Sequence, residues 1–194
     1  MAANIEYEVP TWNQIYDMLL NQAQKIHSDG YKPDITIGIA RGGLVPARVL
    51  SDLLETLSLA TVQVEFYLDI AQTRKEPVLK QGLSVLITDK KALLVDDISD
   101  TGKSLKLAKN HLLQQGAKEI KTATLYAKPQ SITKPDYYEK GTCRWVVFPW
   151  EVKETVRKII QKQEGIRVTN REIGKLVKAG LPKQLAEKLL RDME

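Results

Sequence analysis

Apolar and polar positions alternate along this chain in a pattern that predicts strands and helices in turn. The run DITIGIA, residues 34–40, is apolar enough for a buried strand, and leucines recur between residues 44 and 57 as on one face of a helix. Alternating apolar positions over residues 61–68 predict a second strand. The polar stretch that follows, as far as Leu83, predicts a long loop, and loops of that length are usually functional or disordered.

The same alternation continues on both sides of this region. An amphipathic helix is expected near the N-terminus, and short apolar runs at 85–88 and 92–95 predict strand, turn, strand. A helix over 103–115 should end at Gly116, followed by a strand over 119–128. Strands that alternate with helices in this way indicate an α/β fold with a mainly parallel sheet flanked by helices.

The C-terminal segment has its own helix signals. Thr169 and Glu172 fit a capping box, Gly180 can end that helix, and Pro182 can open the next one. We therefore expect a core over residues 1–152 and a small helical C-terminal extension over residues 153–194. Packing or oligomerisation is the favoured role of this extension; a helix-turn-helix that binds nucleic acid is the less favoured one.

Composition narrows the class of protein. The chain of 194 residues carries a net charge of +5, and residues 151–194 hold eleven Lys or Arg against seven Asp or Glu, which favours anionic partners. No apolar run approaches the roughly 18 residues of a membrane span, and acids at the N-terminus argue against a secretory signal. A cytoplasmic protein is expected. Its single cysteine, Cys143, excludes an internal disulfide and is expected to be a small buried apolar residue.

The stretch LLVDDISDTGKSL, residues 93–105, carries the candidate chemistry. We expect the strand to end where Asp96 and Asp97 begin, at the carboxyl edge where open α/β sheets bind ligands. The backbone N–H groups of residues 100–104, at the start of a helix, can cradle a phosphate. Thr101 and Ser104 add hydroxyl groups, and Gly102 permits close approach.

A phosphate cradle beside two carboxylates suits a ribose 5-phosphate. Its 2′- and 3′-hydroxyls can donate to Asp96 and Asp97, and Asp100 would then point toward the anomeric side. A Walker A loop is excluded because Asp97 stands where its first glycine should be. No G-x-G-x-x-G follows a predicted strand, so a dinucleotide fingerprint is excluded as well.

These residues resemble the phosphoribosyl pyrophosphate (PRPP) signature of the type I phosphoribosyltransferases. The resemblance implies that family's fold, with a small hood, and assigns the 5-phosphate to residues 100–104, Lys103 included. The segment IARGGLVPA, residues 39–47, is similar to the family's pyrophosphate loop, which the resemblance places on Ala40, Arg41, Gly42 and Gly43.

Within the family, the chain looks most like the hypoxanthine/guanine and xanthine/guanine branch. The resemblance covers residues 34–151 and implies that Lys128 contacts the purine O6 and that Trp145 stacks on the base, with Val146 and Glu151 beside it. It also implies that residues 67–82 form a flexible loop over the diphosphate. The residues that the resemblance assigns to this loop are Tyr67, Arg74 and Lys75; Phe66 departs from the serine that the family often has.

The implied reaction is purine salvage: the 5-phosphoribosyl group passes from PRPP to N9 of a purine, and pyrophosphate leaves. The resemblance implies Mg²⁺, held mainly through substrate oxygens, with Asp96 and Asp97 as the candidate protein ligands, and a homodimer or higher homo-oligomer. Asp100 is the candidate acid or base at N7, while Asp96 and Asp97 would stabilise the cationic sugar. No role is assigned to His27 or His111.

Several alternatives stay open at this point. A 6-oxopurine is favoured, but adenine is the alternative base. The alternative interpretation of Lys128 is an exposed lysine at a strand end with no role in binding. The alternative interpretation of Trp145 is a buried core residue that does not contact the base. A PRPP-sensing regulator that binds nucleic acid through its tail is the alternative of another class, but Lys128 and Trp145 count against it. The same two residues also argue against a pyrimidine transferase.

Overall fold

The computed structural model describes residues 5–66, 76–162 and 166–193. The chain divides into two compact units, one of residues 17–142 and one that joins residues 1–16 to residues 143–194. The boundary expected after residue 152 stays a prediction. None of the helices in the described ranges is long and apolar enough to cross a membrane.

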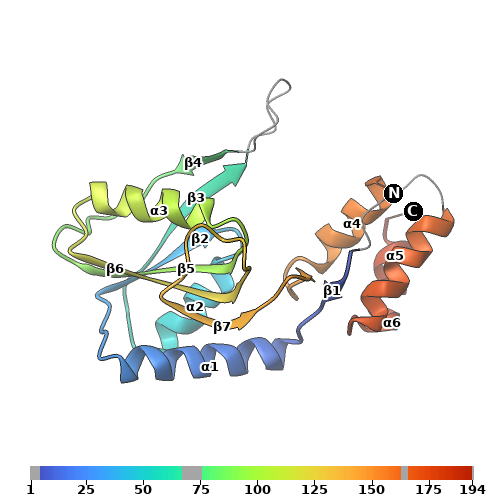
Figure 1. The fold of residues 1–194 in the computed structure, drawn as a ribbon, viewed down its shortest axis with the longest axis horizontal. Coiled ribbons are helices and arrows are strands. Elements are labelled where there is room, and N and C mark those ends of the chain that lie inside the picture. The colour runs from blue at the N-terminus through green and yellow to red at the C-terminus, as the bar shows by residue number, and fades with distance from the viewer. Residues whose placement is uncertain (1–4, 67–75, 163–165, 194) are drawn as a thin grey trace. The chain divides into compact units, whose positions relative to one another are not determined.

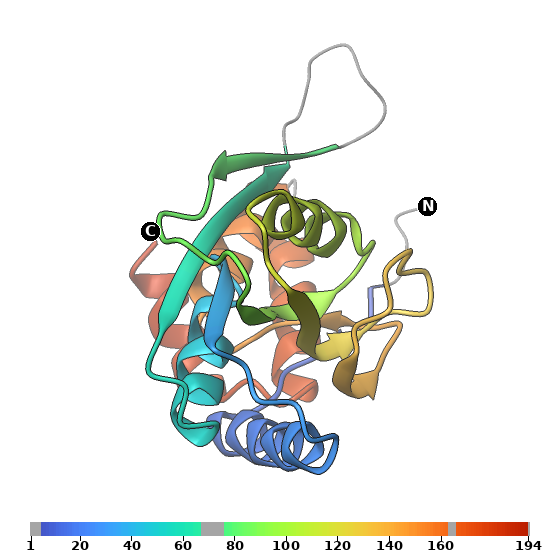
Figure 2. The same cartoon turned by 90° about the vertical axis from the view of Figure 1, so that its left-hand side faces the viewer.

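The larger unit is built on a six-stranded sheet in the order β4-β3-β2-β5-β6-β7. All neighbouring strands are parallel except β3 and β4, which are antiparallel. Helix α3 covers one face, and α2 with the later part of α1 covers the other (Figure 1; Figure 2). The bounds are β2 Ile35–Ala40, β3 Leu59–Phe66, β4 Pro77–Gln81, β5 Lys91–Ser99, β6 Glu119–Ala127, β7 Tyr137–Gly141, α1 Trp12–Ser28, α2 Leu44–Leu53 and α3 Lys103–Gln114. The expected α/β class and mainly parallel sheet are therefore confirmed.

The core between α3 and the sheet explains why the apolar runs form central strands. Leu105, Ala108 and Leu112 recur at helical spacing and are all buried against strand residues that are apolar on both faces. Leu94 of β5 is fully buried in this cluster. Burial of one such leucine stabilises the fold by about 1.5–3 kcal/mol, so the core fixes β5 and the start of α3 firmly.

The structure differs from the predicted elements in two segments that precede β5, residues 77–81 and residues 85–88. Residues 77–81, expected in a loop, form β4, an exposed edge strand that tolerates Pro77 at its first position. Residues 85–88, expected as a strand, have no regular structure. There Ile87 alone is fully buried while Leu86 is 85% exposed, so the apolar run reflects one anchoring residue rather than a paired strand.

The smaller unit combines a short sheet with the C-terminal helices. Strands β1 (Tyr7–Glu8) and β8 (Trp145–Val146) are parallel, and the helices are α4 (Val152–Lys162), α5 (Ile166–Lys178) and α6 (Lys183–Arg191). Apolar residues at helical spacing form a separate core that includes Val156, Leu176 and Ala186. A helical C-terminal segment, as expected from the sequence, is confirmed. Cys143, expected to be buried, is exposed, so that prediction is wrong.

The predicted start of α5 is wrong. The helix begins at Ile166, so Thr169 lies inside it and is not its N-cap. The Glu172 carboxylate accepts a hydrogen bond from the Tyr7 hydroxyl at 3.4 Å and pairs with Lys175 at 2.8 Å. These partners lower the pKa of Glu172, the Lys175 contact most of all. The glutamate that looked like part of a capping box is held by an ion pair within α5 and by a long-range hydrogen bond from Tyr7 instead.

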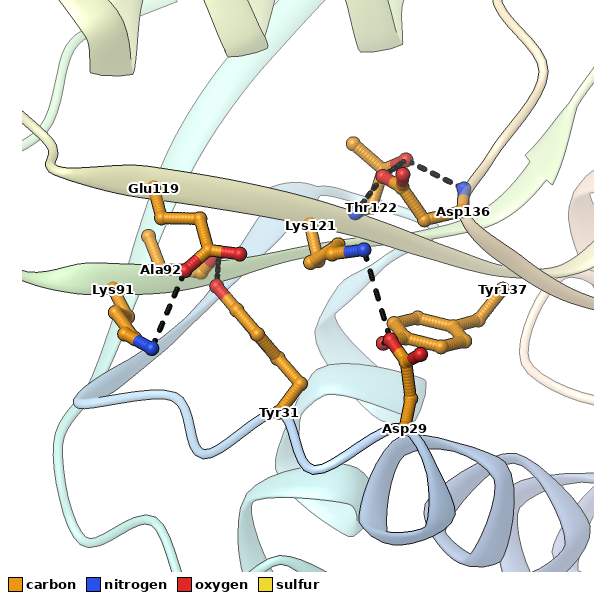
Figure 3. A network of polar contacts seen from close by, with 9 residues as sticks. All are labelled: Asp29, Tyr31, Lys91, Ala92, Glu119, Lys121, Thr122, Asp136 and Tyr137. Atoms are coloured by element: carbon orange, nitrogen blue, oxygen red, sulfur yellow. Dashed lines mark hydrogen bonds and ion pairs between the residues drawn. The ribbon is translucent and has the colours of Figure 1, made fainter.

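A polar network lies at the amino ends of β5 and β6 (Figure 3). The Tyr137 hydroxyl donates to Asp29 at 2.6 Å, and Lys121 lies 3.6 Å from the same carboxylate. The Tyr137 contact, and then Lys121, lower the pKa of Asp29. A wide groove of about 860 Å³ opens beside these residues. Because its charged groups pair with one another and ligands of parallel sheets bind at the opposite, carboxyl edge, we assign this network to the connection between α1 and the sheet.

Candidate active site at the carboxyl edge of the sheet

Strand β5 carries the acidic motif further than the sequence suggested. The strand was expected to stop before Asp96, but it continues to Ser99. Up to Val95 it pairs with both β2 and β6, and beyond Val95 it pairs with β6 alone. The two acids therefore lie just past the last residue of β5 that pairs with β2, on the side of β5 that faces the turn after β2.

The two adjacent carboxylates have different surroundings. Asp97 is 8% exposed, whereas Asp96 is half-buried and accepts a hydrogen bond from the Asp97 backbone N–H at 3.0 Å. Burial first, and then the charge of Asp97, raise the pKa of Asp96 well above its usual range. A cation or hydroxyl donors near this pair would relieve that electrostatic cost.

The turn between β2 and α2 packs directly on the acidic strand. The Gly43 N–H donates to the Ile39 carbonyl at 2.8 Å, and the peptide bond between Ala40 and Arg41 is cis. A Cβ on Gly42 would lie 2.7 Å from Oδ1 of Asp97 and closer still to Oδ2. Only glycine permits this approach, so the expected pyrophosphate turn and the acids form one continuous edge.

The expected phosphate cradle opens helix α3. Gly102 has a φ of +75° and stands at the N-cap of α3, a conformation that glycine adopts without strain. Its Cα faces the next loop so closely that a Cβ would lie 2.6 Å from the Thr133 backbone nitrogen. Lys103 pairs with Glu76 at 2.6 Å, and Ser104 is half-buried in the first helical turn. The N-terminal N–H groups of α3 are thus placed to bind an anion.

A cavity of about 200 Å³ lies between the end of β5, the start of α3 and Phe66 of β3. Its lining brings together Asp96, Asp100 and the residues that open α3. It also includes residues to which sequence reasoning gave no role: Ile98, Ser99, Leu105 and the ring of Phe66. The last residue of β2, Ala40, pairs with Gln63 of β3, and Phe66 lies three residues further along β3. How far β3 extends past β2 depends on the alignment of the two strands, which no local sequence signal predicts.

Lys128 and Asp100 lie together beside this cavity. The Lys128 ammonium is 3.3 Å from Oδ1 of Asp100, and its side chain is only 10% exposed. The alternative of an ordinary exposed lysine is therefore wrong. Gln130 also donates to Oδ1 of Asp100, at 3.1 Å, a contact that the sequence pattern did not suggest. A cationic donor and a carboxylate thus stand side by side.

The other predicted base-contacting residues belong to the smaller unit. Trp145 is 49% exposed, so the alternative of a core tryptophan is wrong, whereas Val146 is buried. Glu151 precedes α4 and accepts a hydrogen bond from the Phe148 N–H at 3.2 Å. The roles assigned to all three in base binding stay predictions. Tyr67, Arg74 and Lys75, which were predicted to act from a loop, lie outside the described residues.

The donor set limits how a metal ion can be held. Within the described residues, no cluster of three or more His, Cys, Asp and Glu side chains is arranged to hold a metal ion. Asp96 and Asp97 nonetheless supply hard carboxylate oxygens, of the kind that Mg²⁺ prefers, and a bound cation would offset the burial and the neighbouring charge that raise the pKa of Asp96. The site fits a Mg²⁺ ion that takes most of its ligands from substrate and water.

Two comparisons by sequence agree with this geometry. Residues 11–156 match the model of the phosphoribosyl transferase domain. A xanthine-guanine phosphoribosyltransferase of Cereibacter sphaeroides is 32% identical over 150 residues, which cover 73% of this chain and 85% of that protein. One of the same name from Nitratidesulfovibrio vulgaris is 32% identical over 158 residues, 79% of this chain and 91% of its own.

The fold leads to the same group of proteins. A purine phosphoribosyltransferase from Pyrococcus horikoshii superposes with a TM-score of 0.68 at 39% identity, over 75% of this chain and 94% of that one. The matched residues include both turns and the acidic strand that line the candidate site, because the family model spans them all. This chain is a member of the phosphoribosyltransferase family.

Proposed function

We propose that the protein transfers the 5-phosphoribosyl group of PRPP to N9 of a purine, with a 6-oxopurine favoured over adenine. The observation that carries this proposal is the Lys128–Asp100 pair at 3.3 Å beside the sugar-phosphate cavity. O6 and N7 lie on one edge of a 6-oxopurine, so an ammonium and a carboxyl group side by side can meet both. The names of the curated relatives support the same choice of base and favour a transferase over a regulator.

PRPP is proposed to bind through its two ends. The 5-phosphate accepts N–H bonds from residues 101–104, where α3 begins, and the hydroxyl groups of Thr101 and Ser104 add to them. The diphosphate lies toward the turn of residues 40–43, where Arg41 supplies charge-assisted hydrogen bonds. The cavity of about 200 Å³ beside the start of α3 is proposed to hold the sugar phosphate.

The acids of β5 are proposed to hold the ribose. Asp96 and Asp97 accept hydrogen bonds from its hydroxyl groups and stabilise the positive charge that develops on the sugar as pyrophosphate leaves. Bound Mg²⁺ supplies charge neutralisation to the leaving pyrophosphate. The packing of Gly42 on Asp97 keeps this carboxylate at a fixed position relative to the diphosphate turn.

The proposed chemical step exchanges one bond at C1 of the ribose for another. The bond from C1 to the pyrophosphate oxygen breaks as N9 of the purine bonds to C1, and the proton that the base carries at N7 passes to Asp100. Lys128 donates to O6, which also favours the tautomer with an oxygen at that position. Trp145 is proposed to offer a flat face to the base, with Val146 and Glu151 near it.

Three further features belong to this proposal and rest on the family resemblance. Tyr67, Arg74 and Lys75 are proposed to act from a loop over the diphosphate. The protein is proposed to work as a homodimer or higher oligomer in the cytoplasm. Neither a nucleic acid nor a membrane is required for the reaction.

The test is a comparison of bases. The purified chain is incubated with Mg²⁺, PRPP and xanthine, guanine, hypoxanthine or adenine in turn, and pyrophosphate release is measured. We expect turnover with the 6-oxopurines and little with adenine. No release with any base, together with PRPP-dependent binding of nucleic acid, would replace the transferase by a regulator.

Lys128→Met tests the choice of base directly. It should reduce kcat/KM for the 6-oxopurines by roughly 10- to 100-fold and leave that for adenine nearly unchanged, because a lost charged hydrogen bond costs about 1.5–3 kcal/mol. The matched control is Lys118→Met, which changes an exposed lysine just before β6. An equal loss for both classes of base would remove Lys128 from base discrimination.

A further inference from the structure

Two donors from the segment after β6 converge on one oxygen of Asp100. Gln130 Nε2 donates to Oδ1 at 3.1 Å, and Lys128 Nζ lies 3.3 Å from the same atom. An ionised carboxylate only accepts hydrogen bonds, so this contact fixes which end of the Gln130 amide faces Asp100. Neither contact uses Oδ2, which leaves that oxygen available for a ligand.

Gln130 stands on a closed turn rather than on a loose surface loop. The Ser131 N–H donates to the Lys128 carbonyl at 3.0 Å, which closes a β-turn over residues 128–131. Pro129 occupies the second position of this turn, where its fixed φ is favoured. The third position, held by Gln130, therefore has a defined backbone direction.

The turn is also anchored on both sides to the segment that carries Asp100. The Lys128 N–H donates to the Ser99 carbonyl at 2.9 Å, and the Ile132 N–H donates to the Thr101 carbonyl at 3.0 Å. These two bonds flank Asp100 in the sequence. The separation between Asp100 and the turn is therefore set by main-chain contacts that do not depend on a side chain.

Lys128 and Gln130, the two donors to Asp100, differ in whether they also contact the substrate. In the proposed function, on which this inference rests, Lys128 also donates to O6 of the base. An amide is neutral, and the proposed chemistry asks nothing else of the Gln130 side chain. We propose that Gln130 is a positioning residue, which keeps Oδ1 of Asp100 in place while Lys128 engages the purine and so aims Oδ2 at N7.

A double-mutant cycle tests this role. Gln130→Met removes the donor at similar side-chain length, and it is made in the native protein and in Asp100→Asn. In the native protein we expect kcat with guanine to fall about tenfold, a part of the roughly 10²–10⁴ that acid–base catalysis contributes. The KM for PRPP should stay within about twofold, because the phosphate cradle is not touched. In Asp100→Asn the same change should lower kcat by less than about twofold, because no proton transfer remains to be aligned.

The outcomes separate this inference from the proposed function. Gln114→Met, at the exposed end of α3, is the matched control and should leave kcat unchanged. An equal loss of kcat in both backgrounds, or none in the native protein, would overturn the positioning role. If the native protein released no pyrophosphate with any base, the proposed function would fail by itself. A crystal structure of Lys128→Met/Gln130→Met, compared with that of Lys128→Met alone, then still decides: with both donors removed the Asp100 side chain should rotate, and an unchanged torsion would refute the inference.

Discussion

Replacing Gly42 by alanine puts a methyl group against the carboxylate of Asp97. The added carbon would lie 2.7 Å from Oδ1 and closer still to Oδ2, whereas ordinary contact of a Cβ begins at 3.4 Å. Because Oδ2 is the nearer of the two atoms, the carboxylate or the turn must move by about 1 Å or more. The neighbouring Gly43 leaves the turn little room, because its own position is closed by the Val95 carbonyl.

A shift of this size matters because catalysis depends on position. A displacement of about 1 Å can cost about 10²-fold in rate, so we expect kcat/KM for PRPP to fall by roughly 30- to 100-fold in Gly42→Ala. The assay is pyrophosphate release at varied PRPP, and urea unfolding shows whether the fold survives. The stability should change much less than the activity, because Asp97 can turn toward the open edge of β5.

The control is Gly174→Ala, in the middle of α5. Nothing lies within 4 Å of the position of its Cβ, so this change should keep full activity and stabilise the helix by about 0.5–1 kcal/mol. Near-native activity of Gly42→Ala, with Asp97 unmoved in a crystal structure, would show that the contact between the turn and the acid has no catalytic importance.

Three further changes test the remaining parts of the account. Asp100→Asn should lower kcat by about 10²–10⁴ with little change in the KM for PRPP, and unchanged turnover in steady-state kinetics would remove Asp100 from the chemistry. Leu94→Ala, in the fully buried centre of β5, should destabilise the protein by about 2–5 kcal/mol in urea unfolding, and a loss below 1 kcal/mol would argue against this core. Burial raises the pKa of Tyr31 above its usual value of 10.0, so the stability that its neutral form supplies is complete below pH 10 and is lost as the pH rises further. The melting temperature of Tyr31→Phe should therefore fall less steeply than that of the native protein between pH 10 and 11, and equal slopes would contradict the assignment.

Local signals predicted the centre of the sheet and the start of α3 well. The structure has the strands predicted from the apolar runs of β2 and β5. It also buries the helix face predicted from the spacing of Leu105, Ala108 and Leu112. Each of these signals is a property of a short segment. The edges were predicted poorly, because an edge strand such as β4 is mostly polar and its pairing with β3 is a non-local contact. The start of α5 was predicted wrongly because Glu172 fits a capping-box pattern but pairs with Lys175 inside the helix and accepts a hydrogen bond from the distant Tyr7.

The candidate site shows the same division. Asp96, Asp97 and Asp100 lie within five residues, so their proximity to one another could be predicted from the sequence. The contact of Gly42 with Asp97 depends on how two strands are aligned, and the hydrogen bond from Gln130 depends on how one loop packs on another. A glutamine after a proline carries no signal of that kind in a single sequence.

The central claim is that the turn into α3 binds a sugar monophosphate by its main-chain N–H groups. A crystal structure of the protein with ribose 5-phosphate tests it most directly. The account predicts the phosphate within hydrogen-bonding distance of the N–H groups of residues 101–104, with the sugar hydroxyls facing Asp96 and Asp97. A phosphate bound elsewhere, with only water in this cavity, would contradict the account.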